Sequence, residues 1–358
     1  MSRSSPIKFS DVCLPAGSAD SVARVVNTGW LSQGPEVRKL EQLFSDRSAQ
    51  YSLACSSGTT ALHLALEALE ISSGDVLVPA LSYVATANAV LYAGLSPVFI
   101  DVDPISRCMS PSAMRAAVTD DVKAVILVDL NGRVGQNIEC AAIAKRMGLH
   151  VIDDAAQALF SGRAGTYADI SCYSLHGSKI VTAGEGGVIT TPDKNLHERI
   201  ELLRGQGQVK NKRYIHDRLA YNYRMTEMQA AIAQKSFSTL DRSIDVHLRL
   251  GEKYCETLSL QRDLTDGEYD WKYAVSVPHL TRAQRDAIVD DMADVVETRP
   301  MFYPLPEMSH LRGYPNDGYV VSSTISSMTL FLPLHVNLTD EDVLSVCEAL
   351  TRSIEKCT

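Results

Sequence analysis

The sequence is short of three features: long apolar runs, blocks of basic residues and closely spaced cysteines. No run approaches the roughly 18 to 20 apolar residues of a membrane-spanning helix, and the first residues lack the apolar core of a secretory signal. Asp and Glu (43) outnumber Lys and Arg (34), and the formal net charge of −9 is spread along the chain. We therefore expect a cytoplasmic protein with neither nucleic acid nor a membrane as a partner.

The eight cysteines are scattered, and none belongs to a Cys-x-x-Cys pair. This pattern is typical of reduced, individually buried thiols rather than of disulfide bonds or zinc ligands. The sequence thus predicts no metal site.

The chain does have the length and apolar content for a large core, with 358 residues of which 45% are hydrophobic. Short apolar runs at residues 75–79, 97–101, 124–128 and 150–154 alternate with helical stretches such as 59–69 and 84–92. Strands buried on both faces and separated by helices indicate an α/β fold with a mostly parallel central sheet flanked by helices. Ligands bind such sheets at the carboxyl ends of the strands.

The alternation of short apolar runs with helical stretches ends after Pro192. We predict a long helix from about residue 225 to 258, followed by a second unit that mixes helices and strands. Its elements are a strand at 271–277, a helix at 281–295, an extended Pro-rich stretch at 299–306, a strand at 329–332 and a closing helix from Thr339. We expect a large α/β domain over residues 1–245 and a smaller C-terminal α+β domain over residues 246–358.

One lysine has an unusual setting. Lys179 follows a turn of small residues and precedes Gly184, Gly186 and Gly187, where backbone must approach another group closely. An amine becomes a nucleophile only when its proton can leave, which burial and cationic neighbours promote. A single lysine beside a Gly-rich turn is more often a solvated surface residue, so the functional interpretation depends on its context.

Asp154 supplies part of that context. It ends the apolar run at 150–154, and the two alanines before Gln157 leave room for a flat ring. A carboxylate there can pair with a protonated pyridine nitrogen, and Gln157 can reach a phenolic oxygen of the same ring. The alternative for a single strand-end aspartate is a cap on the next turn or helix.

A phosphate site is indicated where Ser57, Gly58 and Thr59 lead from an apolar run into a helical one. Small residues expose backbone N–H groups at a helix start, where phosphate binds readily, although the same residues also serve as plain caps. The Gly-Lys-Ser/Thr ending of a P-loop is missing. Tyr83 follows the run at 75–79 and can either stack over a ring or pack in the core.

In their order along the chain, these motifs resemble the nucleotide-sugar aminotransferases of the DegT/StrS type, a family of fold-type I enzymes that use pyridoxal 5'-phosphate (PLP). The matching text lies in residues 29–34, 57–63, 154–157, 174–187 and 221–225. Within that family, residues 203–207 and 222–226 are most similar to those of GDP-perosamine synthases.

The resemblance implies that Lys179 holds PLP as a Schiff base, with Asp154 at the pyridine nitrogen and Gln157 at the phenolic oxygen. Tyr83 would cover one face of the ring. The phosphate would be bound by Ser57, Gly58, Thr59 and Ser174, with Asn222 reaching in from the partner subunit of a homodimer. His176 would assist proton transfer, or else be a packed histidine without a chemical role.

The implied reaction moves an amino group from L-glutamate, by way of pyridoxamine 5'-phosphate, to a 4-keto-6-deoxy nucleotide sugar, with a 3-keto sugar as the lesser option. The setting would be amino-sugar biosynthesis for a polysaccharide. Candidates for contacting the nucleotide sugar are Trp30, Leu31, Ser32, Tyr223 and Arg224. Three alternatives stay open: transamination of a free cyclic ketone of the inosose type, a PLP-dependent sugar dehydratase, and a regulator without turnover. The related dehydratases have histidine where Lys179 stands.

Overall fold

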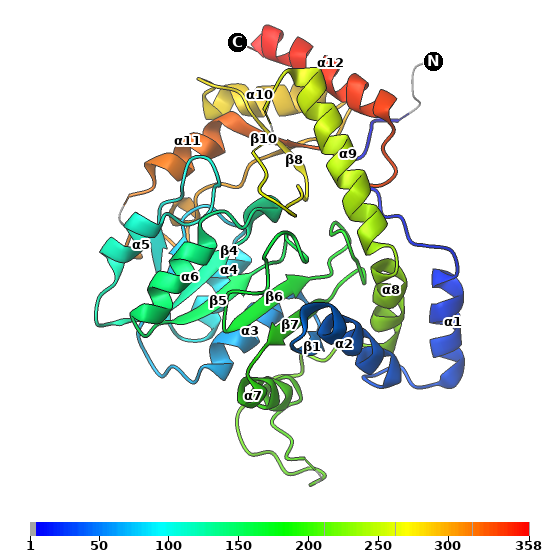
Figure 1. Ribbon diagram of the computed structural model, residues 1–358, viewed down its shortest axis with the longest axis vertical. Coiled ribbons are helices and arrows are strands. Elements are labelled where there is room, and N and C mark those ends of the chain that lie inside the picture. The colour runs from blue at the N-terminus through cyan, green and yellow to red at the C-terminus, as the bar shows by residue number, and fades with distance from the viewer. Residues whose placement is uncertain (1–4, 211, 262, 317, 358) are drawn as a thin grey trace.

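The computed structural model describes residues 5–210, 212–261, 263–316 and 318–357. Within these residues a seven-stranded sheet forms the centre of the molecule (Figure 1). Its strands, in spatial order, are β1 (Tyr51–Cys55), β7 (Gly187–Thr191), β6 (Ile170–Ser174), β5 (His150–Asp154), β4 (Val122–Val128), β2 (Asp75–Pro79) and β3 (Ser96–Ile100). Neighbours pair in parallel except where β7 lies antiparallel to β1 and β6. The expected mostly parallel α/β fold is thus confirmed.

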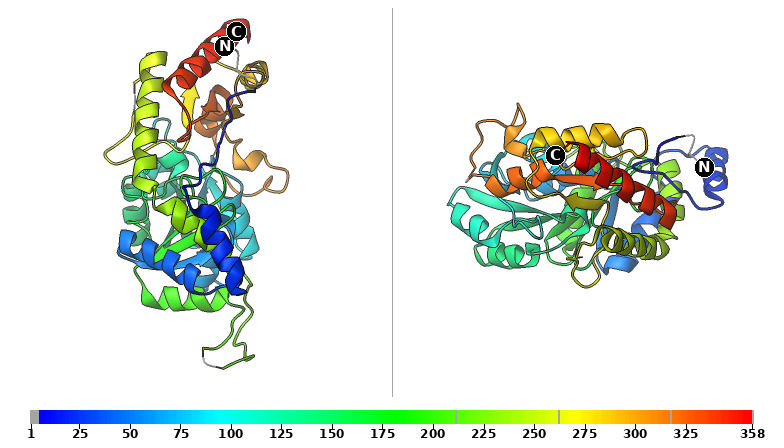
Figure 2. Two further views of the ribbon diagram at one scale, coloured as in Figure 1. Left: turned by 90° about the vertical axis from the view of Figure 1, so that its right-hand side faces the viewer. Right: turned by 90° about the horizontal axis from the view of Figure 1, so that it is seen from above.

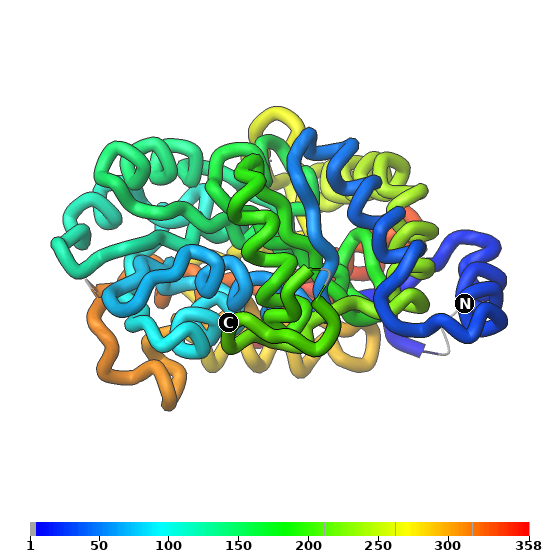
Figure 3. Tube along the Cα trace, turned by 90° about the horizontal axis from the view of Figure 1, so that it is seen from below, coloured from blue at the N-terminus to red at the C-terminus, as the bar shows by residue number. Residues whose placement is uncertain are grey.

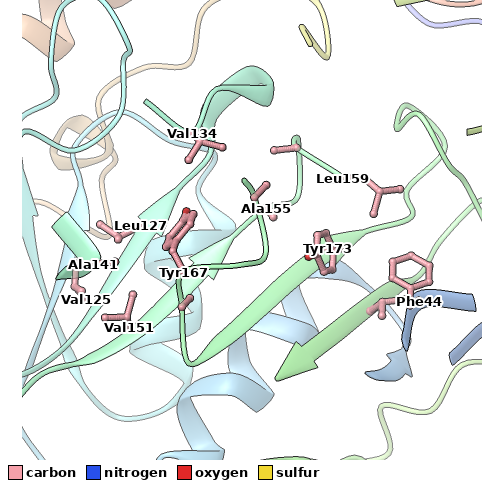
Figure 4. Packing of buried hydrophobic residues seen from close by; sticks show 14 of the residues in the cluster. Phe44, Val125, Leu127, Val134, Ala141, Val151, Ala155, Leu159, Tyr167 and Tyr173 are labelled. Atoms are coloured by element: carbon pink, nitrogen blue, oxygen red, sulfur yellow. The ribbon is translucent and has the colours of Figure 1, made fainter. Parts of the chain in front are cut away.

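Helices cover both faces of this sheet, and the alternation of side chains along β4 shows why. Val125 and Leu127 belong to one apolar core, whereas Ala124 and Ile126 belong to the other. The first core packs under α2 (Pro35–Ser48) and α6 (Asn137–Arg146), and Figure 4 shows part of it around Tyr167 and Tyr173. The second packs under α3 (Gly58–Ala68), α4 (Ala85–Tyr92) and α7 (Lys194–Arg204). Seen from below, the two helical layers lie on opposite sides of the strands (Figure 3).

The remaining helices of this part are α1 (Ser18–Thr28), α5 (Pro111–Ala117), α8 (Glu227–Phe237) and the short 3₁₀ helix η1 (Leu130–Gly132). α1 and α2 both pack against α8. Glu227 binds this group together, because its carboxylate accepts hydrogen bonds from the N–H groups of Glu36 and Val37 at the start of α2, both at 2.9 Å.

A second, smaller sheet lies above the first and has the order β8 (Tyr273–Ser276), β10 (Thr329–Leu332), β9 (Arg299–Pro300) (Figure 2). A third apolar core surrounds it, with side chains such as Leu250, Ile288, Leu330 and Val346. The helices of this region are α9 (Leu240–Leu258), α10 (Arg282–Met292), η2 (Leu305–Glu307), α11 (Val320–Met328) and α12 (Asp340–Cys357). The division at residues 245 and 246 stays a prediction; α9 spans it.

Most predicted strands are confirmed, three of them with the predicted limits: 75–79, 150–154 and 329–332. The single long helix at 225–258 is wrong, because the backbone leaves helical geometry at Thr239 (φ −111°, ψ 9°) and separates α8 from α9. The helix predicted at 281–295 is shorter at both ends, since Thr281 is its N-cap and its last residue is Met292. None of the described helices combines the length and apolarity needed to cross a membrane.

Candidate active site

The predicted site residues come from several strand ends that meet at one edge of the large sheet. β1 ends before Ser57, β2 before Tyr83, β5 at Asp154 and β6 at Ser174. Because these strands point the same way, their carboxyl ends converge. Together they line a cavity of about 390 Å³, whose walls include Ser57, Gly58, Thr59, Tyr83, Asp154, Gln157, Ser174, His176 and Lys179.

Asp154 is buried, and its side chain is held from two sides. Thr86 at the start of α4 donates its hydroxyl proton to Oδ2 at 2.7 Å, and the N–H of Ala156 donates to Oδ1 at 3.2 Å. Burial raises the pKa of this carboxyl, while the hydrogen bonds and the charge of Lys179 oppose that rise. A cationic group placed in the cavity would favour the ionised form of Asp154.

Lys179 follows β6 in a tight turn. Its N–H donates to the His176 carbonyl at 2.9 Å, and its Nζ lies 4.1 Å from the centre of the Trp271 ring. Trp271 also donates from Nε1 to the Ser178 carbonyl at 2.8 Å. Burial lowers the pKa of Lys179 to about 8, and Asp154 opposes this shift. The amine therefore loses its proton far more readily than a solvated lysine, as a nucleophile must.

Gln157 and the start of α3 complete the walls. The Gln157 Oε1 accepts from the buried Asn131 N–H at 2.7 Å, so its amide NH₂ is the group left to donate to a ligand. Ser57 is the N-cap of α3 and forms a capping box with Thr60. A Cβ on Gly58 would stand 3.0 Å from the Ser174 Cβ, so the glycine keeps the backbone of the helix start close to Ser174.

Tyr83 and His176 lie at the rim of the cavity. The Tyr83 side chain is exposed and meets the ring of Phe302 edge to face, with 5.9 Å between centroids. The His176 Nδ1 lies 3.0 Å from the Ser178 hydroxyl, and its Nε2 lies 3.8 Å from a Glu185 carboxylate oxygen. His176 is therefore an exposed rim residue, not a packed one.

A pair of carboxylates lies behind the site. Asp153 points to the sheet face opposite Asp154, and the Tyr167 hydroxyl oxygen lies 2.9 Å from Asp153 and 2.6 Å from Asp129. One hydroxyl donates one hydrogen bond, so the second contact requires a proton on a carboxyl group. Burial raises the pKa of Asp153 to about 7 and that of Asp129 well above its usual range. One proton is thus held between these two groups.

Other predicted residues do not line the cavity of their own chain. Asn222 is exposed and forms a β-bridge with Gly205. The described residues between them, 206–210 and 212–221, belong to a projecting segment that extends away from the body (Figures 1 and 2). Tyr223 stacks on Tyr221, and Arg224 bridges to Cys55. The remaining three form an exposed turn before α2: Trp30, Leu31 and Ser32.

Two wall residues escaped the sequence interpretation. Thr86 lies in the helical stretch predicted at 84–92, but no local pattern indicates its hydrogen bond to Asp154, which depends on how α4 packs. Trp271 is more than ninety positions after Lys179 and precedes the small sheet. No local pattern marks it, and only the packing of the small sheet over the large one places it here.

PLP presents a phosphate, an aldehyde, a phenolic oxygen and a pyridine nitrogen. The cavity offers a matching group for each: the α3 start beside Ser174, the Lys179 amine, the Gln157 amide and the Asp154 carboxylate. The residues present therefore fit this cofactor.

The comparisons with known proteins agree with this fit. Residues 13–351 match the DegT/DnrJ/EryC1/StrS aminotransferase family. Two relatives named GDP-perosamine synthase, from Caulobacter vibrioides and Escherichia coli O157:H7, are 34% and 33% identical over 94% and 92% of this chain, and over 95% and 93% of their own length. The crystal structure of the aminotransferase TlmJ from Streptoalloteichus hindustanus superposes with a TM-score of 0.91 at 25% identity, covering 99% of this chain and 100% of TlmJ. The chain thus belongs to the DegT/DnrJ/EryC1/StrS aminotransferase family and is a PLP-dependent aminotransferase.

Proposed function

We propose that this aminotransferase moves an amino group from L-glutamate to the ketone of a 4-keto-6-deoxy nucleotide sugar, in the cytoplasm, for amino-sugar biosynthesis. The observation that carries the proposal is that Lys179 and Asp154 line one cavity with pKa values moved toward each other, the amine lowered and the carboxyl raised. Such opposed shifts are typical of groups that handle protons in a reaction.

Each residue has a separate task in this proposal. Lys179 removes a proton from the carbon next to the amino group of the donor and would deliver it to the carbon that bore the aldehyde of the bound cofactor, because its pKa of about 8 lets it act as both base and acid near neutral pH. Asp154, held by Thr86, keeps a proton on the ring nitrogen. The bound PLP supplies an electron sink for the carbanion chemistry. Trp271 excludes water from one side of the amine.

The acceptor is inferred from the relatives and from the exposed turn at Trp30. The two GDP-perosamine synthases align over nearly the whole chain, which supports a sugar nucleotide of similar kind. Trp30, Leu31 and Ser32 lie outside the cavity of their own chain, as do Tyr223 and Arg224. They are available to bind a substrate that extends from a site completed by a second subunit.

The placement of Asn222 supports the proposal of a homodimer with shared sites. This residue is exposed at the base of the projecting segment and does not line the cavity that it is proposed to serve. Complementation tests the arrangement: Lys179→Ala and Asn222→Ala chains, each inactive alone, should regain activity when mixed and refolded. Each mixed dimer would hold one intact site. No recovery at any mixing ratio would contradict the sharing.

The substrate assignment is tested on the purified enzyme with its cofactor. GDP-, UDP- and dTDP-linked 4-keto-6-deoxy sugars are offered with glutamate, and the products are identified by mass. We expect an amino sugar from at least one of them and a fall in the absorbance of the bound cofactor when glutamate alone is added. Turnover only with free cyclic ketones would replace the sugar-nucleotide assignment. No response to any amino donor would reject the function.

A further inference from the structure

A second cavity lies beside the first, and Lys179 forms part of both walls. It has a volume of about 290 Å³. Its sides come from residues far apart in the chain: the N-terminal segment from Ser10 to Ala16, the turn from Gly177 to Thr182, the start of α9 and the segment from Leu334 to Asn337. A ligand there would reach the same amine that acts in the first cavity.

The charged groups of this cavity are mostly cationic. Lys272 is buried, and its Nζ donates to the carbonyls of Phe9 at 3.1 Å and Leu334 at 3.0 Å. An ammonium has three protons, so a protonated Lys272 keeps one for a ligand. Arg242, on the first turn of α9, forms no ion pair within the part of the chain that the structure describes. The carboxylate in the lining, Asp11, already contacts Lys8 and Asn337.

Neutral groups of the lining also lack partners. The Ser10 hydroxyl and the Nδ1 of His335 are buried without a hydrogen bond in the described structure. Buried polar atoms of this kind are rare in folded proteins unless a ligand or water completes them. The positive end of the dipole of α9, a 19-residue helix, also lies at this wall. The cationic groups and the Ser10 hydroxyl favour an anion. The His335 Nδ1 is an acceptor, because its Nε2 donates to the Lys8 carbonyl at 3.1 Å, and it is left for an N–H or O–H group of the ligand.

We propose that this cavity binds the anionic end, a carboxylate or a phosphate, of the substrate whose reacting end lies at Lys179. The inference rests on the proposed function and names a subsite for it. A volume of about 290 Å³ accommodates one small anionic group and the carbons next to it. Two substrates of the proposed reaction carry such a group: the amino donor through its second carboxylate, and the acceptor through its diphosphate.

Protonation of Lys272 provides a measurable sign that an anion occupies the subsite. Burial lowers the pKa of Lys272 to about 7, with a smaller contribution from Lys179. The other titratable groups in the lining are His247 and His335, whose pKa values burial also lowers, together with Arg242, Asp11 and Cys13. A bound anion raises the pKa of an adjacent amine, so Lys272 takes up a proton from solution when the site fills.

Calorimetry on the cofactor-loaded enzyme at pH 7.5 tests both the binding of an anion and the uptake of a proton. The probes are glutarate, which carries two carboxylates but no amine, butyrate, which carries one, and inorganic pyrophosphate. Buffers of different ionisation enthalpy report the protons taken up. We expect glutarate or pyrophosphate to bind with proton uptake, and butyrate to bind at least about tenfold more weakly than glutarate, since a charged hydrogen bond is missing.

The variants separate the subsite from general effects. Arg242→Ala should weaken the preferred probe by about tenfold or more, and Lys272→Met should abolish the proton uptake. Arg249→Ala is the matched control, because Arg249 lies on the same helix and pairs with Asp340 away from the cavity. Preference for glutarate assigns the subsite to the donor, and preference for pyrophosphate assigns it to the acceptor.

The inference is overturned if no probe binds, or if Arg242→Ala and Arg249→Ala bind equally well. Because Arg242 is exposed, its variant keeps the test valid even if Lys272→Met fails to fold. Failure of the proposed function gives a different result. In that case glutamate leaves the absorbance of the bound cofactor unchanged in the wild-type enzyme, whatever the calorimetry shows.

Discussion

The Nζ of Lys179 lies over the indole ring of Trp271, 4.1 Å from its centre, although Lys179 follows β6 of the large sheet and Trp271 precedes β8 of the small one. Trp271 is buried, and its Nε1 holds the Ser178 carbonyl next to the lysine. The aromatic ring thus does two things for the amine: it removes water, and it fixes the turn from which the side chain extends.

Trp271→Ala is expected to expose Lys179 and raise its pKa from about 8 toward the value of a free lysine. Only the neutral amine adds to an aldehyde, so the rate at which apoenzyme takes up PLP should rise with pH through about 8 in the wild type. In the variant the midpoint should move to higher pH. An absorbance titration of the recombination rate measures this, and an unmoved midpoint would show that Trp271 does not control the amine.

Lys179→Ala should retain the fold and lose covalent attachment of the cofactor. We expect turnover to fall by about 10²- to 10⁴-fold or more, since the acid and base are lost together. Borohydride reduction followed by mass spectrometry should find the cofactor attached at Lys179 in the wild type and nowhere in the variant. Lys123→Ala, at the opposite edge of the sheet, is the control. Turnover at the wild-type rate in the Lys179 variant would contradict the proposed mechanism.

Asp154→Asn and Asp153→Asn make a matched pair on adjacent positions of β5. Asparagine at 154 keeps the shape but cannot hold a proton on the ring nitrogen, so turnover should drop by about 10²-fold or more. Asparagine at 153 faces the other side of the sheet and replaces one of the two carboxyls that hold the inferred proton between them. Its turnover should stay within a few-fold of wild type. Equal losses in both variants would mean that the wrong aspartate was assigned.

The raised pKa of Asp153 also predicts how the stability of the folded protein depends on pH. Its pKa is raised to about 7 by burial, above the value of about 4 that an unfolded aspartate has. The folded state therefore holds the proton more tightly, and the stability that this gives is present below pH 4 and lost as pH rises through 7. Asp153→Asn should flatten that part of the pH profile of thermal unfolding. An unchanged slope between pH 4 and 7 would show that another group is responsible.

The strand-end residues were accessible from the sequence because each lies within a short, locally readable pattern. Ser57, Asp154 and Ser174 each follow or end a run of apolar residues, and parallel strands bring such ends to one edge. The break between α8 and α9 was not accessible, because the apolar spacing continues through Thr239 while the backbone turns. Periodicity reports which face is buried, not where a helix bends.

The sequence by itself determined the α/β class, the order of the strands along the chain and the strand-end positions of the residues proposed to bind the cofactor, because these depend on local patterns and on the direction of each strand. Only the tertiary structure decided that Trp271 covers Lys179, that Asp153 shares a proton with Asp129, and that Lys272 and Arg242 meet at a second cavity. The first and third relationships depend on how the small sheet and α9 pack against the large sheet, and the second depends on how β4 pairs with β5. In all three cases the residues lie outside one another's local sequence, so no local pattern specifies the contact.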